Sequence, residues 1–262
     1  MNENDKGKIM KKLLSLSLAC ALLSASALST AAPIGDKIKT AMASDIRSAA
    51  EVERDRNRRP VQTLEFFGLE DNMSVVELIP GGGWYTKLLA PALSENGEFY
   101  IAIGAGRVKE NMAGVAGFEK MKVIAEDASS YREEGASSYS LKATTLGVSD
   151  VDMVLTFRNY HNFGEQGRKK MNELAFDALR PGGIYGVVDH TARHMEPSNS
   201  SNRRRIDPVL AIKEIQEAGF VLVDYSNLHY KEDDELEYEV GARSVSGNTD
   251  RWTMKFMKPK GE

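Results

Sequence analysis

The chain has 262 residues, of which 42% are hydrophobic and 27% are charged, and its formal net charge is −4. These values are ordinary for a globular protein and argue against a strongly basic nucleic-acid binder, so we expect no nucleic-acid partner. The single cysteine, Cys20, falls in a segment that we expect to be removed, which leaves the mature chain without a disulfide or thiol chemistry.

Residues 1–31 are typical of an N-terminal extension with a secretory signal peptide. Lys11 and Lys12 precede an apolar stretch at 13–28, and small residues lead to Ala31, after which we expect cleavage. The apolar stretch is too short and too rich in serine for a membrane-spanning helix, which needs ~20 apolar residues. We therefore expect an exported, periplasmic protein without stable membrane insertion after cleavage. An uncleaved amphipathic anchor is the alternative.

Residues 32–70 predict an N-terminal helical segment. Apolar residues recur every three or four positions from 35 to 59, in a stretch that becomes very polar at "EVERDRNRRP". Pro60 should end this helix, and "VQTLEFFGL" predicts a second short helix. The arginines between Arg54 and Arg59 are typical of a solvated face.

Residues 71–262 predict an α/β domain, because strand and helix patterns alternate along this part of the chain. We expect strands at 74–79, 98–103, 121–126, 151–157, 184–189, 220–225 and 251–258. We expect helices at about 84–93, 165–180 and 206–218. Such alternation indicates a mostly parallel sheet covered by helices on both faces.

A glycine-rich turn follows the first strand in "VVELIPGGGWYT", residues 75–86. In a parallel sheet, ligands bind at the carboxyl ends of the strands. The three glycines at 81–83 would let the backbone approach a ligand closely, and the amide dipoles of the following helix favour a negative group. Glu77, at the end of the strand, could bind amino or hydroxyl groups. A tight turn without a ligand is the alternative.

Four stretches together carry a resemblance to a known family. They are "ELIPGGGWYT" at 77–86, "FRNYHNF" at 157–163, "LRPGGIYGVVDH" at 179–190 and "RRIDPVLAIKEIQEAGFVLVDYS" at 204–226. From about Arg54 to Lys258 the chain resembles the class I S-adenosylmethionine-dependent methyltransferases. More narrowly, it resembles a bacterial group of predicted methyltransferases with the same "PGGGWYT" and "VVDH" signatures.

The resemblance implies a Rossmann-like class I methyltransferase fold. Its mostly parallel seven-stranded sheet would carry helices on both faces, with the last strand inserted antiparallel between the fifth and sixth. It also implies that S-adenosylmethionine is the cofactor and that the protein methylates an acceptor, which we take to be a small molecule.

The resemblance also implies roles for individual residues. Positions that hold the methionine end of the cofactor are matched by Glu77, Gly81 and Gly83, with Gly82 between them. Asp127 resembles the acid that meets the adenine amino group. Residues that line up cofactor and substrate are matched by Arg158, Asn159 and His161. Trp84 and Tyr85 could line the cofactor pocket or simply pack over the glycine turn.

The chain departs from the family pattern at two positions. Ile79 stands where the first glycine of the motif is usual, and the second strand ends in "YIAIGAG" without the acid that commonly holds the ribose hydroxyls. These departures favour an alternative function, an exported non-catalytic ligand-binding or accessory protein on a degenerate methyltransferase fold.

Polar residues at two strand ends suggest the catalytic groups. Asp189 and His190 end the fifth strand and His161 follows the fourth, so all three should border one cleft. A histidine with a pKa near neutral beside a carboxylate could take the proton of a methyl acceptor. We predict His190 as the base or substrate orienter, Asp189 as its support and His161 as an assistant. Alternatively, Asp189 caps the following loop and His190 lies on the surface.

Two further interpretations concern ligands. Arg205, at the start of a predicted helix, could hold an anionic group of the substrate, because guanidinium binds carboxylate or phosphate in two-point fashion. The histidines at 161, 190 and 194 with Asp189 could instead bind a metal such as zinc. We favour the methyltransferase interpretation and expect no metal.

Overall fold

The structure is a computed structural model that describes residues 33–261. The predicted signal peptide and its cleavage after Ala31 lie outside these residues and stay predictions. From residue 33 to residue 261, no helix combines the length and the apolar character needed to cross a membrane.

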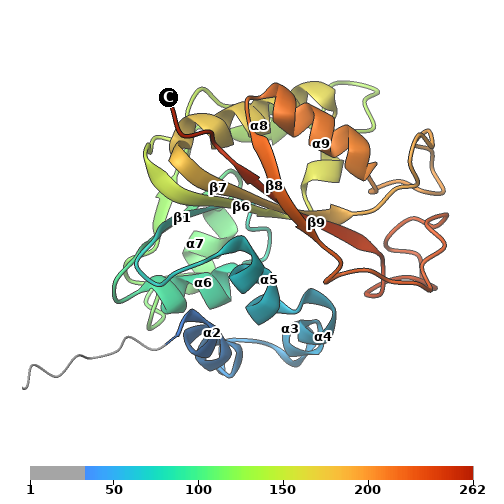
Figure 1. The fold of residues 1–262 in the computed structure, drawn as a ribbon. Coiled ribbons are helices and arrows are strands. Elements are labelled where there is room, and N and C mark those ends of the chain that lie inside the picture. The colour runs from blue at the N-terminus through green and yellow to red at the C-terminus, as the bar shows by residue number, and fades with distance from the viewer. Residues whose placement is uncertain (1–32, 262) are drawn as a thin grey trace, which may run out of the picture. The chain divides into compact units, whose positions relative to one another are not determined.

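Strands and helices alternate through most of the described residues (Figure 1). The helices are α2 (Ile34–Met42), α3 (Ala49–Glu53), α4 (Asp55–Arg58), α5 (Pro60–Phe67), α6 (Thr86–Leu93), α7 (Gly106–Met112), α8 (Glu165–Ala178) and α9 (Pro208–Glu217), with a short 3-10 helix at Tyr160–Asn162. The strands are β1 (Ser74–Leu78), β2 (Glu98–Ala102), β3 (Lys122–Ile124), β4 (Ser129–Tyr131), β5 (Ser140–Lys142), β6 (Val151–Phe157), β7 (Leu179–His190), β8 (Val221–Ser226) and β9 (Arg251–Met257).

Seven strands form one sheet in the order β3-β2-β1-β6-β7-β9-β8. The strands from β3 to β7 in this order pair in parallel. The last strand of the chain, β9, pairs antiparallel with both β7 and β8. The prediction of a mostly parallel seven-stranded sheet with its last strand inserted antiparallel between the fifth and sixth is therefore confirmed.

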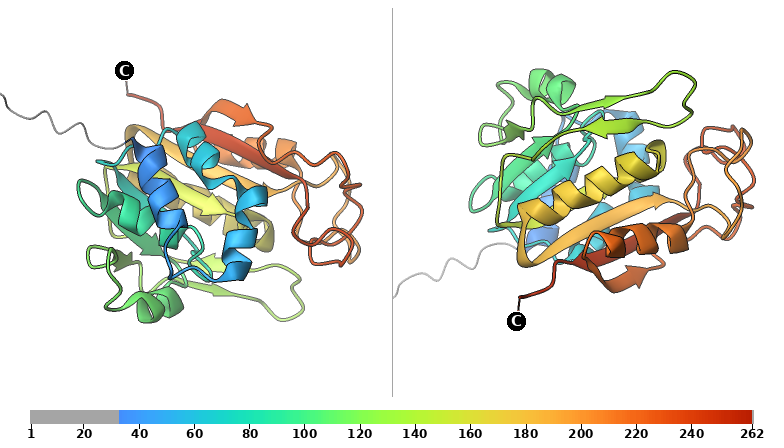
Figure 2. Two further views of the ribbon diagram at one scale, coloured as in Figure 1. Left: turned by 90° about the horizontal axis from the view of Figure 1, so that it is seen from below. Right: turned by 90° about the horizontal axis from the view of Figure 1, so that it is seen from above.

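Helices cover both faces of this sheet because its central strands are apolar on both sides. Val75 of β1 packs into the cluster with α2, α5 and α6, whereas its neighbour Val76 packs into the cluster with α8 and α9. Consecutive residues of a strand point to opposite faces, and burying each such side chain contributes ~1.5–3 kcal/mol. Figure 2 shows α2 to α5 over one face and α8 with α9 over the other.

The N-terminal helical segment differs from the single helix expected at 35–59. Helix α2 ends at Met42, and a new helix begins after Ser48. Ser48 and Glu51 form a capping box, in which Glu51 N donates to Ser48 Oγ (3.3 Å) and Ser48 N donates to Glu51 Oε2 (2.8 Å). This local signal starts a helix inside the periodic stretch and overrides its continuity.

Three short elements were not predicted from the sequence. They are α7 and the hairpin strands β4 and β5, which pair antiparallel outside the main sheet. Each strand of the hairpin has only three residues, too few for an alternating pattern to emerge.

Candidate functional site

The four parallel strands β3, β2, β1 and β6 all end in the same unusual backbone conformation. The residue after each strand has a left-handed φ: Ala125 (50°), Ile103 (63°), Ile79 (53°) and Arg158 (59°). For residues other than glycine this conformation costs on the order of 1–3 kcal/mol, and it is concentrated at functional sites. The carboxyl edge of the sheet, where ligands bind in open α/β folds, is thus also where the backbone is strained.

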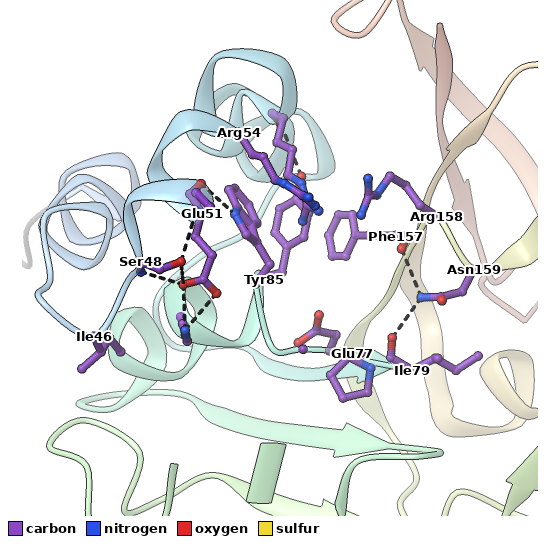
Figure 3. A pocket seen from close by; sticks show the side chains of 17 residues that line it. Ile46, Ser48, Glu51, Arg54, Glu77, Ile79, Tyr85, Phe157, Arg158 and Asn159 are labelled. Atoms are coloured by element: carbon purple, nitrogen blue, oxygen red, sulfur yellow. Dashed lines mark hydrogen bonds and ion pairs between the residues drawn. The ribbon is translucent and has the colours of Figure 1, made fainter. Parts of the chain in front are cut away.

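Ile79, where the resemblance leads us to expect a glycine, has the left-handed φ of 53° that glycine adopts most readily. Its carbonyl oxygen accepts a hydrogen bond from Asn159 Nδ2 (2.9 Å), which also donates to the carbonyl of Phe157 (3.1 Å) (Figure 3). Asn159 therefore links the ends of β1 and β6. The departure at Ile79 changes the side chain but keeps the left-handed turn of the backbone.

A cavity of about 570 Å³ lies at this edge. Its size falls within the range of small-molecule pockets, ~300–1,000 Å³. It is bounded by the glycine turn, by the end of β6 and by the N-terminal helices α3 and α4. Most of the predicted cofactor-binding residues line it, namely Glu77, Gly81, Gly82, Trp84, Tyr85, Arg158 and Asn159.

The three glycines have different surroundings. Gly81 and Gly82 are exposed, and a Cβ atom added at either would meet no atom within 4 Å. Gly83 is buried, has φ of +80°, and would bring its Cβ to 3.2 Å from Val108 of α7. The first two glycines leave room at the cavity, whereas Gly83 lies outside its lining and permits close packing of α7.

Glu77 presents a buried carboxyl group to the cavity. Its side chain accepts a hydrogen bond from Thr86 Oγ1 (2.6 Å), and the residue is 3% exposed. Burial raises the pKa of Glu77 to about 7, although the Thr86 hydrogen bond and the charge of Arg58 act in the opposite direction. Near neutral pH the carboxyl group can therefore accept a cationic or hydrogen-bonding ligand group at small energetic cost.

Trp84 and Tyr85 both line the first cavity and also pack over the glycine turn. Lining a pocket and packing over the turn are therefore not mutually exclusive for these two residues. Tyr85 stacks on Phe157 with ring centroids 3.5 Å apart and planes at 11°. Trp84 meets Tyr85 edge-on at 4.7 Å, and its Nε1 donates to the carbonyl of Glu51 (3.0 Å). The Arg58 guanidinium lies 4.3 Å over the Trp84 ring. These contacts of Trp84 and Tyr85 connect the N-terminal helices to the ends of β1 and β6.

A second cavity, of about 500 Å³, adjoins the first. The two cavities share four lining residues, Ala50, Arg54, Arg58 and Arg158. His161 and His190 line the second cavity, and their ring centroids are 5.5 Å apart. The two histidines therefore lie at one cavity as expected, whereas Asp189, predicted to border it with them, is fully buried and lines neither cavity.

The carboxylate of Asp189 contacts the imidazole of His161 and not that of His190, from which it accepts only a backbone hydrogen bond (2.6 Å), and this corrects the predicted roles. Asp189 Oδ1 lies 2.5 Å from His161 Nδ1, and Oδ2 accepts from the backbone N of His161 (2.9 Å). Asp189 and His190 are consecutive residues of β7, so their side chains point to opposite faces of the sheet. An Nδ1 proton donated to Asp189 leaves His161 Nε2 as the free acceptor, the arrangement of a general base.

His190 is a buried neutral histidine, so the interpretation of it as a surface residue is wrong. It is 4% exposed, and its Nδ1 lies 2.8 Å from Thr249 Oγ1. Burial lowers the pKa of His190 well below its ordinary value, and the charges of Arg251, His161 and Arg158 lower it further. A neutral imidazole at this position can orient a substrate by hydrogen bonding.

Arg205 has a structural environment that corrects its predicted contact with substrate. Its guanidinium pairs with Asp234 (2.9 Å at both nitrogens), and both side chains are fully buried. It also donates to the carbonyls of Tyr238 (2.8 Å) and Thr191 (3.1 Å). Since Arg205 lines neither cavity, we assign it to holding the loop before β9 against the start of α9.

His194 lies apart from the other two histidines. It is exposed, and its Nδ1 lies 2.8 Å from Asp207. Within residues 33–261, no three histidine, cysteine or acidic side chains lie close enough together to hold a metal ion.

A small cavity of about 160 Å³ lies at the ends of β2 and β3. Its lining is mostly small or apolar, with residues Ile103, Gly104, Ala105, Gly106, Lys109, Val123, Ile124, Ala125, Glu126 and Ala128. Asp127 is exposed and lines none of the three cavities, although its neighbours Glu126 and Ala128 both line the small one. The acid at this cavity is therefore Glu126 and not the predicted Asp127.

Three arginines of the site, unlike Arg158, were not predicted from the sequence. Arg54 and Arg58 line both large cavities and Arg251 lines the second, although the stretch around Arg54 is typical of a solvated face. Arg58 is only 7% exposed. Because residues four apart share one face of a helix, the spacing of Arg54 and Arg58 was the available signal.

The chain matches no family model and no curated protein sequence. A SAM-dependent methyltransferase from Aquifex aeolicus has a similar structure, with a TM-score of 0.54 at 17% identity over 86% of this chain and 98% of that one. The cyclase SpnF gives a TM-score of 0.54 at 14% identity over 78% of this chain and 81% of its own. Human N-acetylserotonin methyltransferase, solved in complex with SAM, gives 0.51 at 13% identity over 87% of this chain and 57% of its own.

At these identities the similarity concerns the fold alone. The chain has an α/β fold with a seven-stranded, mostly parallel sheet, which it shares with structures of SAM-dependent methyltransferases.

Proposed function

We propose that this protein is an S-adenosylmethionine-dependent methyltransferase that acts on a small molecule. The observation that carries the proposal is the first cavity, where Glu77, the open glycine turn and Asn159 meet at the ends of β1 and β6. This is the edge of the sheet at which ligands bind in α/β folds, in a chain whose fold is that of methyltransferases.

The residues of the first cavity fit the methionine end of the cofactor. The buried carboxyl of Glu77 suits its amino group, and the open space at Gly81 and Gly82 allows a close approach to the backbone. The guanidinium groups of Arg54 and Arg158 point toward each other across the cavity in Figure 3 and suit its carboxylate. S-adenosylmethionine, when bound, would supply an electrophilic methyl group on a sulfonium sulfur.

The residues near the expected position of the adenosine part fit the cofactor less well than those at its methionine end. The apolar cavity beyond β2 and β3 suits an adenine ring, and Glu126 lines it. The turn after β2 supplies Ile103 and Gly104 and no carboxylate for the ribose hydroxyls. We therefore expect lower affinity for the cofactor than a ribose-binding acid would give.

His161 is the general base in this proposal. Its Nε2 would take the acceptor's proton as the acceptor heteroatom bonds the methyl carbon and the carbon–sulfur bond breaks, leaving that electron pair on sulfur. Asp189 would stabilise the resulting imidazolium, since its carboxylate is 2.5 Å from His161 Nδ1. His190, neutral and 5.5 Å away between ring centroids, would help to orient the acceptor.

The narrower assignments remain part of the proposal. The "PGGGWYT" and "VVDH" stretches support membership of the exported bacterial group, and residues 1–31 support export to the periplasm. The division into an extension at 1–31, a helical segment at 32–70 and an α/β domain at 71–262 is proposed on the same basis.

Calorimetric titration with S-adenosylmethionine and S-adenosylhomocysteine tests the proposal. We expect saturable binding to the wild-type protein and its loss in Gly82→Leu, whose side chain would occupy the open space at the turn. Gly261→Leu is the matched control, because Gly261 is exposed and has equally open surroundings. A folded wild-type protein that binds neither compound would refute the proposal.

A second candidate is the non-catalytic ligand-binding protein, which the missing acid after β2 favours. The similar fold of the cyclase SpnF illustrates that this architecture also serves other chemistry. Binding of S-adenosylhomocysteine that survives His161→Gln, with no methyl transfer by the wild type to any anionic acceptor, would favour this candidate.

A further inference from the structure

We propose that the second cavity binds the methyl acceptor through an oxyanion, so that the substrate is a small molecule carrying a phosphate or carboxylate group. This inference rests on the proposed function, because it names the substrate class of the same site. The evidence is an accumulation of arginine side chains that carboxylates of the protein do not balance.

Six arginines line the second cavity: Arg54, Arg56, Arg58, Arg158, Arg204 and Arg251. Glu53 is the one acidic residue of that lining within the described part of the chain. Such an excess of positive charge is unexpected by chance in a chain whose formal net charge is −4. The charge is therefore concentrated at this site.

Two of the six arginines are neutralised by the protein. Arg56 pairs with Glu53 (3.4 Å), and Arg204 pairs with Glu239. The remaining four, Arg54, Arg58, Arg158 and Arg251, form no ion pair with any carboxylate among residues 33–261. We call these four the free arginine cluster.

Two members of the free arginine cluster are deeply buried. Arg58 is 7% exposed and Arg251 is 5% exposed. Arg58 lies over Trp84, whereas Arg251 donates from Nη1 to the carbonyl of Asn57 (2.9 Å) and has no partner at Nε. A buried cation is costly unless it is paired, and two-point binding of an oxyanion is the ordinary way to pair a guanidinium.

The members of the cluster are close enough to repel one another. Burial and, after it, the charge of Arg158 lower the pKa of Arg58 to about 9 and that of Arg251 to about 10, although Asp189 and Asp250 act in the opposite direction on Arg251. Both side chains still carry their charge at neutral pH. An anion between them would relieve both the burial and the repulsion.

The cofactor alone does not account for the cluster. Its single carboxylate would lie in the first cavity, where Arg54, Arg58 and Arg158 are within reach, but Arg251 lines only the second. His161 and His190 also line the second cavity, so an anion held by Arg251 would bring its molecule to the proposed base. A cavity of about 500 Å³ suits a small molecule.

Titration of the purified protein with inorganic phosphate and with citrate tests this inference. The titrations are done at low ionic strength, where screening of the arginines is weak, with and without saturating S-adenosylhomocysteine. We expect saturable binding of at least one anion, and we expect it to persist when S-adenosylhomocysteine is bound.

Arg251→Gln should weaken this anion binding about tenfold or more, because it removes a charge-assisted hydrogen-bonding group, and should leave the affinity for S-adenosylhomocysteine unchanged. Arg251→Lys, which keeps a positive charge but loses the two-point geometry of a guanidinium, provides a second variant in case Arg251→Gln does not fold, and it should also weaken the anion binding. Arg59→Gln is the matched control, because Arg59 is exposed, belongs to the same segment and lines neither cavity.

Three outcomes would overturn the inference. They are no saturable binding of either anion, complete competition between anion and S-adenosylhomocysteine, and equal weakening by Arg59→Gln. Binding of S-adenosylhomocysteine in the first case would leave the proposed function intact. Conversely, anion binding that depends on Arg251 in a protein that binds no S-adenosylhomocysteine would refute the proposed function and leave only an anion site.

Discussion

Replacing Glu77 by glutamine should remove a pH-dependent loss of stability from the fold. The folded pKa of Glu77 is about 7, against 4.5 for an ordinary glutamate, chiefly because the carboxyl group is buried. As pH rises from 4.5, the unfolded chain ionises first, so the folded state loses stability until pH passes the folded pKa. Each pKa unit by which the folded and unfolded states differ corresponds to about 1.36 kcal/mol. Above neutral pH the free energy of unfolding of the wild type is therefore lower by about 3 kcal/mol.

Urea denaturation of wild type and Glu77→Gln at about pH 5 and about pH 8.5 measures this effect. Relative to wild type, the variant should gain about 2.5 kcal/mol of unfolding free energy between the two pH values, because the unfolded glutamate is already mostly ionised at about pH 5. Glu110→Gln, at an exposed helical residue, is the matched control and should produce no such gain. Stability curves of wild type and Glu77→Gln that run parallel across this range would refute the argument that a buried carboxyl group lines the cavity.

Three further substitutions test other parts of the site. Asn159→Ala removes the hydrogen bond that joins the ends of β1 and β6, together with a local one to the carbonyl of Phe157. It should cost about 1–2 kcal/mol in urea denaturation and weaken the binding of S-adenosylhomocysteine. Unchanged stability would contradict the linking role. His161→Gln should lower the rate of methyl transfer to an anionic acceptor by about 10²–10⁴-fold without changing the dissociation constant of S-adenosylhomocysteine. An equally large loss of affinity for S-adenosylhomocysteine would argue against a role of His161 as the base. Asp234→Asn breaks the buried pair with Arg205 and should cost about 3–5 kcal/mol in thermal or urea unfolding, so a variant as stable as wild type would show that this pair is dispensable.

The strands and the location of the cavity could be predicted from the sequence because both depend on local patterns, whereas the family resemblance implied the place of the last strand in the sheet. The strand at 151–157 is a continuous apolar run, and the glycines at 81–83 follow another such run directly. Strand ends converge on one edge of a parallel sheet whatever the side chains are. The left-handed conformation of Ile79 could not be predicted from its residue type, because isoleucine rarely adopts it.

The pairing of the candidate catalytic side chains was predicted incorrectly because it depends on residues that are distant in the sequence. Adjacent residues such as Asp189 and His190 suggest a pair, but alternation along β7 separates their side chains. The partner of Asp189 is His161, which reaches it from the turn after β6. The buried arginines were missed because charge runs are ordinarily solvated, and only the packing of Arg58 on Trp84 shows that this run is not.

The structure of the protein in complex with S-adenosylhomocysteine tests the central claim most directly. The account predicts that the homocysteine part contacts Glu77 and the turn at Gly81 and Gly82, with the adenosine beyond the end of β2 and the free arginine cluster still accessible from the second cavity. A ligand bound at another edge of the sheet, or a first cavity that stays closed to it at saturating concentration, would contradict the account.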